Sequence, residues 1–184
     1  RSGRASSFTS MDDINNYAKL AALVRDMTAR KADLGINGVF ACTSLQSGED
    51  WRWQTHLANL PIYYEFKADN IDITKDDISQ VKFTYQAEFK QIFDLYVNNS
   101  TTDPRLLGSK QVADSMAEFA LGQCAMVQNG TWAWSQISGI SGNTVKESDI
   151  RFLPIYSGIP GEETQGLCVG TENYFAINSQ ASAE

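Results

Sequence analysis

Apolar residues recur at helical spacing in the first part of the chain. Ser10 is a suitable N-cap, acidic residues follow in the first turn, and apolar positions then repeat every three or four residues up to Gly35. Glycine at that point is typical of a helix end. The apolar run at residues 36–45 predicts a short strand, and residues 49–60 predict a second helix that ends at Pro61.

The clearest amphipathic pattern covers residues 76–98. Apolar and aromatic side chains form one stripe and charged side chains occupy the other faces, which is typical of a helix packed on a core. The acidic segment at residues 67–77 is predicted to be a solvated turn that caps this helix, because an EF-hand loop would need glycine where Lys75 stands. The stripe consists of Val81, Tyr85, Phe89, Ile92, Phe93 and Tyr96.

The second half of the chain repeats the alternation of helix and strand. A helix is predicted over residues 109–121, a strand over 124–128 and a helix over 131–137, which follows an Asn-Gly turn. Two further extended runs cover residues 150–156 and 167–178. Because short apolar strands alternate with helices, the predicted fold class is α/β. The chain opens in a loop and stops at a helix-start signal, so both ends are expected to be cuts through a longer protein.

Composition and charge exclude several classes of function. The chain has 184 residues, with 15 Lys and Arg against 22 Asp and Glu, and a net charge of −7. Such acidity argues against binding to nucleic acid or an anionic membrane surface. Three cysteines without a C-x-x-C pair predict neither a disulfide framework nor a metal site. Cys42 and Cys124 lie in apolar runs and are expected to be small buried side chains. No cofactor is predicted.

The sequence lacks the usual catalytic motifs. It has no P-loop, dinucleotide-binding fingerprint, nucleophile elbow or zinc-protease motif, and its single histidine, His56, cannot form a histidine cluster. A pair of glycosidase carboxylates remains open as an alternative. Glu162 and Glu163 lie in a loop with glycine and proline and are interpreted as solvated acids. These observations favour a binding protein over an enzyme.

All four tryptophans fall in two W-x-W pairs, Trp51 with Trp53 and Trp132 with Trp134. Residues two apart in a helix point about 200° apart, so one ring of each pair is expected to be buried and the other to face outward. An outward indole beside amides and carboxylates suits a sugar, because the ring stacks on the C–H face of a pyranose.

The segment from Phe119 to Trp134, with its Ala-Met, Asn-Gly and Trp-Ala-Trp groups, carries a family resemblance. It is similar to the extracytoplasmic sugar-binding proteins of ABC importers, the group that includes maltose-binding protein. The runs at residues 150–155 and 170–178 resemble family strands that follow, and residues 9–23 resemble a family helix. The resemblance implies a periplasmic-binding-protein-like α/β lobe of type II, with helices packed on a short mixed sheet, in an incomplete two-lobe fold.

Under this resemblance, residues 1–168 form most of the C-terminal lobe, and residues 169–184 cross the hinge and begin the next segment. The family binds a sugar or oligosaccharide between its lobes and delivers it to an ABC permease in the membrane. The expected location is extracytoplasmic, as a cell-surface lipoprotein or a periplasmic protein, with any lipid anchor outside this sequence. The alternatives are a glycoside-active enzyme and a free-standing carbohydrate-binding module.

The resemblance also assigns candidate ligand-binding residues. Trp132 inherits a sugar-stacking role, and either Trp51 or Trp53 matches an aromatic residue that lines the cleft. Trp134 is expected to be the buried partner of Trp132. Polar candidates beside these rings and near the hinge complete the set: Glu49, Asp50, Asn129, Glu172 and Asn173.

Overall fold

The computed structural model describes residues 10–76, 78–170 and 178–180. Its centre is a run at residues 39–44 in which every residue is at most 4% exposed. This run contains strand β1 (Phe40–Ala41), which pairs in parallel with β2 (Met126–Val127). On the other side of β1, Ser100 forms a parallel bridge with Phe40. The sheet of the described residues is therefore short and parallel, whereas a mixed sheet was expected.

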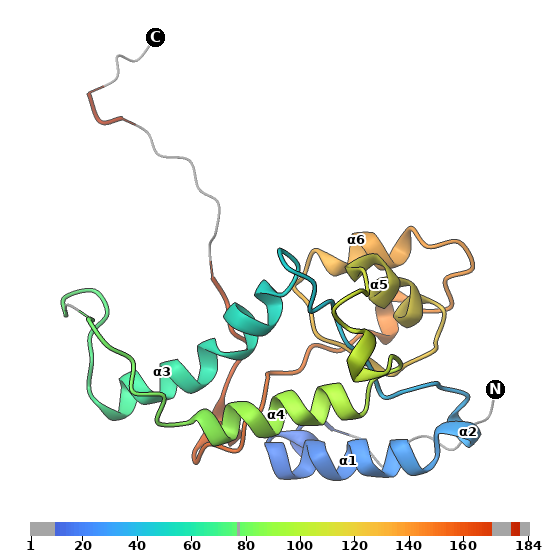
Figure 1. Cartoon of the computed structure of the whole chain (residues 1–184), viewed down its shortest axis with the longest axis horizontal. Coiled ribbons are helices and arrows are strands. Elements are labelled where there is room, and N and C mark those ends of the chain that lie inside the picture. The colour runs from blue at the N-terminus through green and yellow to red at the C-terminus, as the bar shows by residue number, and fades with distance from the viewer. Residues whose placement is uncertain (1–9, 77, 171–177, 181–184) are drawn as a thin grey trace.

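Helices surround this centre, and Figure 1 shows α1 with α4 at one side and α5 with α6 at the other. Two hydrogen bonds join α1 to the α4 region, from Tyr17 Oη to the Gln91 carbonyl (3.3 Å) and from Thr28 Oγ1 to Asn99 Oδ1 (2.8 Å). The helix-rich structure with a parallel strand pair is compatible with the predicted α/β class. The helices are α1 (Tyr17–Ala29), α2 (Lys31–Leu34), α3 (Asn59–Ala68), α4 (Gln86–Asn98), α5 (Val112–Ala120) and α6 (Ala133–Ser138).

Two apolar clusters hold the helices in place. The larger one joins α1, β1 and α4 and includes Trp53, Leu57 and Ile92. The smaller one lies between α5 and α6 and is centred on Met116 and Ile137. The cysteines in the apolar runs, Cys42 and Cys124, are buried as expected.

The helix predicted over residues 76–98 begins ten residues late, at Gln86, although its end at Asn98 is confirmed. In place of the first predicted turns, the segment around residues 82–84 is bound by hydrogen bonds to Glu65 of α3. The buried carboxylate of Glu65 accepts hydrogen bonds from the backbone N–H groups of Lys82 (2.7 Å) and Thr84 (2.6 Å). These backbone bonds, that from Thr84 above all, lower the pKa of Glu65. Phe83 has a φ of 57°, which a continuous helix does not permit.

Pro61 does not end a helix, contrary to the expectation from the sequence. It lies in the first turn of α3, where backbone N–H groups lack partners within the helix, so the missing N–H of proline is tolerated. The preceding residues form a π-helix, η2 (Arg52–Leu57). The single helix predicted over residues 49–60 is therefore replaced by η2 and α3, and the break between them lies at Ala58, before Pro61.

The remaining boundaries differ more modestly. Ser10 caps a short 3₁₀ turn, η1 (Met11–Ile14), and α1 begins after a second cap at Asn16. Gly35 ends the helical segment in the left-handed conformation, as predicted. Residues 150–156, predicted as a strand, form no strand in the structure, and the strand predicted at residues 167–178 lies largely outside the described residues.

Glu162 is buried, 3% exposed, which corrects its interpretation as a solvated acid. Its carboxylate accepts backbone hydrogen bonds from Tyr17 (2.6 Å), Ser157 (2.7 Å) and Gly158 (2.8 Å). Tyr17 is the first residue of α1, so the carboxylate satisfies a helix-terminal N–H and ties the segment after residue 150 to α1.

Replacing Glu162 by glutamine should therefore destabilise the fold. The Gln amide nitrogen cannot accept a hydrogen bond, so a buried backbone N–H loses its partner, and we expect a loss of about 2 kcal/mol. Urea unfolding of the Glu162→Gln variant and of the unchanged protein measures this loss of stability. Glu163→Gln is the matched control, because Glu163 is exposed. Equal stability of the two variants would contradict this assignment.

Gly38 marks the closest backbone contact beside β1. A Cβ atom there would lie 2.3 Å from the Thr101 nitrogen and 2.5 Å from the Ser100 carbonyl carbon. Both are backbone atoms of the segment bridged to β1, so neither can move without disturbing the strand pairing. Glycine at this position permits the parallel contact.

We predict that Gly38→Ala lowers the free energy of unfolding by about 2 kcal/mol, as expected for overpacking against a fixed backbone. Gly108→Ala is the control, because a Cβ atom at Gly108 would meet nothing within 4 Å. Chemical denaturation of both variants tests the idea. The prediction is wrong if Gly38→Ala and Gly108→Ala have the same free energy of unfolding.

Candidate functional site

Both W-x-W pairs follow the carboxyl ends of the two paired strands. The chain leaves β1 through residues 42–50 and reaches Trp51, and it leaves β2 through residues 128–131 and reaches Trp132. Parallel strands have their carboxyl ends at the same edge of a sheet, so the two pairs are brought together although they are about eighty residues apart in sequence. This edge is where open α/β sheets commonly bind ligands.

Three aromatic rings meet there and form what we call the aromatic cluster: Trp51, His56 and Trp132. The ring centroids of Trp51 and Trp132 lie 6.0 Å apart, and His56 lies 5.0 Å from Trp51 and 5.9 Å from Trp132. The contact between Trp51 and His56 is edge-on. Trp132 remains 42% exposed, so the cluster presents an indole surface to solvent.

The prediction of one buried and one outward ring in each pair is confirmed in part, because Trp53 is buried and Trp132 is exposed, whereas Trp51 and Trp134 are both half-buried. Trp53 is 5% exposed, lies in the larger core, and donates its indole N–H toward the carbonyls of Thr43 and Ser44. Trp134 is partly buried against the smaller core. Of the two cleft candidates in the first pair, Trp51 lies in the aromatic cluster and Trp53 does not.

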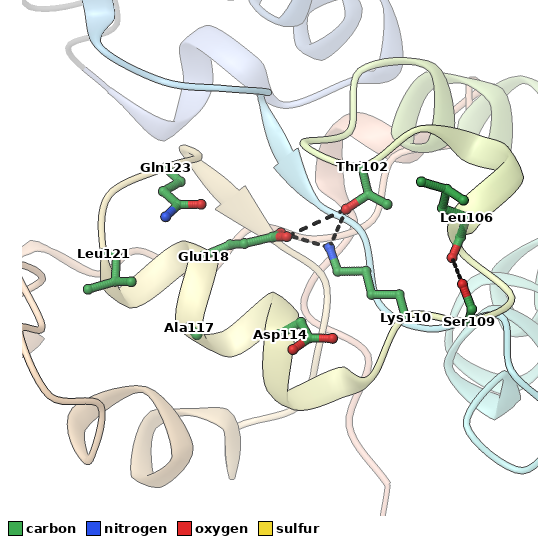
Figure 2. Close-up of a pocket in the computed structure, with 9 residues that line it drawn as sticks. All are labelled: Thr102, Leu106, Ser109, Lys110, Asp114, Ala117, Glu118, Leu121 and Gln123. Carbon is green, nitrogen blue, oxygen red and sulfur yellow. Dashed lines mark hydrogen bonds and ion pairs between the residues drawn. The ribbon is translucent and has the colours of Figure 1, made fainter.

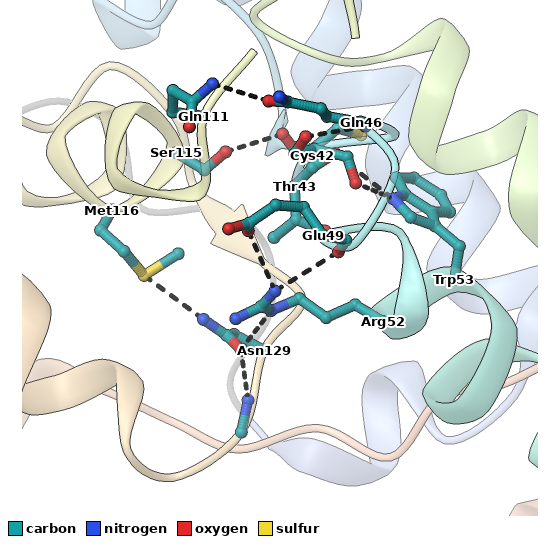
Figure 3. Close-up of polar contacts among 12 residues, drawn as sticks. Cys42, Thr43, Gln46, Glu49, Arg52, Trp53, Gln111, Ser115, Met116 and Asn129 are labelled. Atoms are coloured by element: carbon teal, nitrogen blue, oxygen red, sulfur yellow. Dashed lines mark hydrogen bonds and ion pairs between the residues drawn. The ribbon is translucent and has the colours of Figure 1, made fainter. Parts of the chain in front are cut away.

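Arg52 contacts the aromatic cluster and two polar residues, and Figure 3 shows its contacts with Glu49 and Asn129. Its guanidinium carbon lies 4.2 Å from the centre of the Trp51 ring, a cation–π contact. Its Nε donates to Asn129 Oδ1 (2.9 Å), and its Nη1 lies 3.6 Å from a carboxylate oxygen of Glu49. Glu49 and Asn129, two predicted polar residues, thus both contact Arg52, which was not predicted.

The Arg52 side chain is almost completely buried, and this burial lowers the pKa of the guanidinium, while Glu49 acts in the opposite direction. The side chain also lines a groove of about 310 Å³ between the residue 49–52 segment and helices α5 and α6. Hence the buried cation faces a space of the size that small ligands occupy.

The other predicted site residues are placed differently. The Asp50 carboxylate accepts a hydrogen bond from Gln54 Nε2 (2.7 Å) on the following helix, a local contact at the start of η2. Glu172 and Asn173 lie outside the described residues. The structure therefore groups Trp51, Trp132 and two of the polar candidates.

A second hollow, of about 430 Å³, lies between α5 and the segment after α4 (Figure 2). Its floor holds the buried Lys110 ammonium, which donates to Glu118 Oε2 (2.7 Å) and Thr102 Oγ1 (2.9 Å). Thr101 Oγ1 also donates to this carboxylate (2.6 Å). The charges of Lys110 and Glu118 are paired with each other, and the contacts fasten α5 to the segment beside β1.

Sequence reasoning missed Arg52 and His56, and the π-helix explains why. A π-turn closes with bonds between residues five apart, so it aligns position 51 with position 56. In an α-helix the neighbours would be three or four residues apart. Gln128 Nε2, which lies 2.9 Å from His56 Nδ1, further fixes the imidazole against the second W-x-W segment.

Comparison of the chain with protein-family models, curated proteins and solved structures finds no match in any of the three. Within the described residues, no helix combines the length and apolarity needed to cross a membrane. In the same part of the chain, no group of three or more His, Cys, Asp or Glu side chains is placed to hold a metal ion.

The position of the exposed indole depends on Gly130. A Cβ atom at Gly130 would lie 2.1 Å from Cη2 and Cζ3 of Trp132, so the ring rests directly over the glycine. Any larger residue must displace it.

We predict that Gly130→Ala moves the Trp132 ring away from Trp51 and His56 without unfolding the protein, since a side chain and not the backbone must shift. The indole N–H signals in ¹H–¹⁵N spectra report this displacement, with Trp132 assigned from a Trp132→Phe variant. Gly139→Ala, at the end of α6, is the control because a Cβ atom there meets only an ordinary contact at 3.5 Å. An unchanged Trp132 signal in Gly130→Ala would refute the stated geometry.

Proposed function

We propose that this chain is most of one lobe of a two-lobe sugar-binding protein that delivers a sugar or oligosaccharide to an ABC import permease. The lobe is of the periplasmic-binding-protein type II class. The protein binds and does not catalyse, and it works outside the cytoplasm as a lipoprotein or a periplasmic protein. The observation that carries the proposal is the exposed Trp132 indole, supported by Trp51 and His56, beyond the carboxyl ends of two parallel strands.

The composition of the site supports a carbohydrate ligand. Carbohydrate sites combine a flat apolar surface with a few fixed polar groups, because a pyranose has both a C–H face and a rim of hydroxyls. Trp132 offers the first feature. Arg52, Glu49 and Asn129 offer the second, and their mutual contacts fix their positions before a ligand arrives.

The arrangement of the chain supports a lobe within a larger protein. Among the described residues Trp132 is 42% exposed, so its outer face is open to a second wall supplied from elsewhere. In the two-lobe family that the sequence resembles, that wall is the other lobe, and hinge closure brings the two together. The closed form is what would be presented to the permease.

Replacing Trp132 by alanine should weaken sugar binding by about tenfold or more, since loss of one stacked ring removes roughly 1.4 kcal/mol. Tryptophan fluorescence and calorimetry of the parent protein, titrated with a panel of oligosaccharides, measure this loss. Tyr63→Ala is the control, because Tyr63 is an exposed aromatic residue of α3, outside the aromatic cluster.

Two results would overturn the proposal. A protein that responds to amino acids or peptides but to no sugar is not a sugar-binding protein. Turnover of aryl glycosides would instead identify a glycoside-active enzyme. The isolated chain is expected to bind sugar weakly because it supplies one wall, and tight binding by the chain alone would favour a free-standing module.

A further inference from the structure

The groove beside the aromatic cluster has a distinctive lining. Four polar side chains, Glu49, Arg52, Gln111 and Gln136, face it, and α5 supplies an apolar floor that includes Met116. The volume of about 310 Å³ is at the small end of the range for ligand sites. Figure 3 shows Arg52, Glu49, Gln111 and Met116 gathered around this region.

Two residues that line the groove, Gln136 and Arg52, are linked to the aromatic cluster. Trp132 and Gln136 are four residues apart at the start of α6 and so share a helix face. Trp51 lies between Trp132 and Arg52, with its ring 6.0 Å from the first and 4.2 Å from the guanidinium carbon of the second. A ligand stacked on Trp132 therefore has the groove within reach of its next unit.

The hydrogen-bonding capacity of Arg52 is incompletely used. Its Nε bonds to Asn129 and its Nη1 to the Glu49 carbonyl (3.4 Å), whereas Nη2 makes no hydrogen bond within the described part of the chain. Arg52 is 6% exposed. Nη2 is not among the buried side-chain atoms that lack a partner in the described residues, so it is open to the groove, where a ligand oxygen would accept its hydrogen bond.

The charges favour a neutral ligand. Glu49 stands beside Arg52, so the pair has no net charge, and the chain as a whole carries −7. An acidic sugar would meet the Glu49 carboxylate and the acidic surface. Gln111 and Gln136 add amides, which both donate and accept as hydroxyl groups require.

We infer that the ligand is a neutral oligosaccharide of at least two pyranose units, with one ring on Trp132 and the next in the groove between Arg52, Glu49 and Gln136. This inference rests on the proposed function. In this arrangement the groove distinguishes ligands by their number of sugar units and by their charge. Trp132 supplies the attraction that is common to all pyranoses.

The test uses ¹H–¹⁵N spectra of the 184-residue chain, which detect binding even at tens of millimolar ligand. The probes are matched pairs of methyl glycosides and homodisaccharides of glucose, galactose, mannose and xylose, together with uronate counterparts. For at least one pair, the disaccharide should bind about tenfold more tightly than the methyl glycoside, and its uronate counterpart should bind more weakly. Gln136→Ala should reduce that ratio at least threefold, whereas the matched Gln86→Ala, exposed on α4, should not.

The outcomes separate the two hypotheses. If methyl glycosides bind but every disaccharide binds equally, or if uronates bind more tightly, the inference fails and the proposed function stands. A disaccharide preference that survives Gln136→Ala also overturns it. If no sugar perturbs any signal, both the proposed function and the inference fail.

Discussion

The parallel contact of the buried run at residues 39–44 with its two neighbours is the constraint on which the rest of the structure depends. In the described part of the chain only two residue pairs form a regular ladder, yet every residue of the run is buried. Gly38 allows the segment at residues 99–101 to approach on one side, and the β2 segment pairs on the other. The direction of all three segments is thereby fixed.

That direction determines where the tryptophans go. Parallel strands end at a common edge, so the segments after β1 and β2 must emerge together. An antiparallel pair would have sent the two W-x-W groups to opposite edges of the sheet. The helical spacing within each group then places Trp53 in the larger core and Trp134 half-buried against the smaller one, and it leaves Trp51 and Trp132 in the aromatic cluster. The site follows from the strand direction and the side-chain period.

Much of this could be predicted from the sequence because it depends on local pattern. The alternation of helix and strand, the buried cysteines, the buried Trp53 and the exposed Trp132 all follow from periodicity and residue type. The failures have a common physical cause, which is contact across long sequence separations. The Glu65 carboxylate binds the backbone N–H groups of residues 82 and 84, where a helix was predicted. The Glu162 carboxylate accepts a hydrogen bond from a backbone N–H 145 residues away.

The site residues that were missed have a different explanation. Arg52 and His56 reach Trp51 because the helix between them is widened into a π-turn, a form with no reliable sequence signal. Pro61 lies just beyond, and its ring and missing N–H disturb the helix before it, whereas α3 continues after it. Irregular helical geometry of this kind occurs frequently at functional sites, so its position beside the exposed indole is informative.

Two costly features coincide at this edge of the sheet. A guanidinium is taken out of water with a single, loosely held carboxylate partner, and a large apolar ring is left in water. Each lowers stability when considered alone, because desolvating a charge and exposing an indole are both unfavourable. A ligand with a C–H face and hydroxyl groups relieves both at once, by covering the ring and completing the hydrogen bonds of Arg52. Local departures from stable packing are expected where a protein binds, and here both lie beyond the same strand ends.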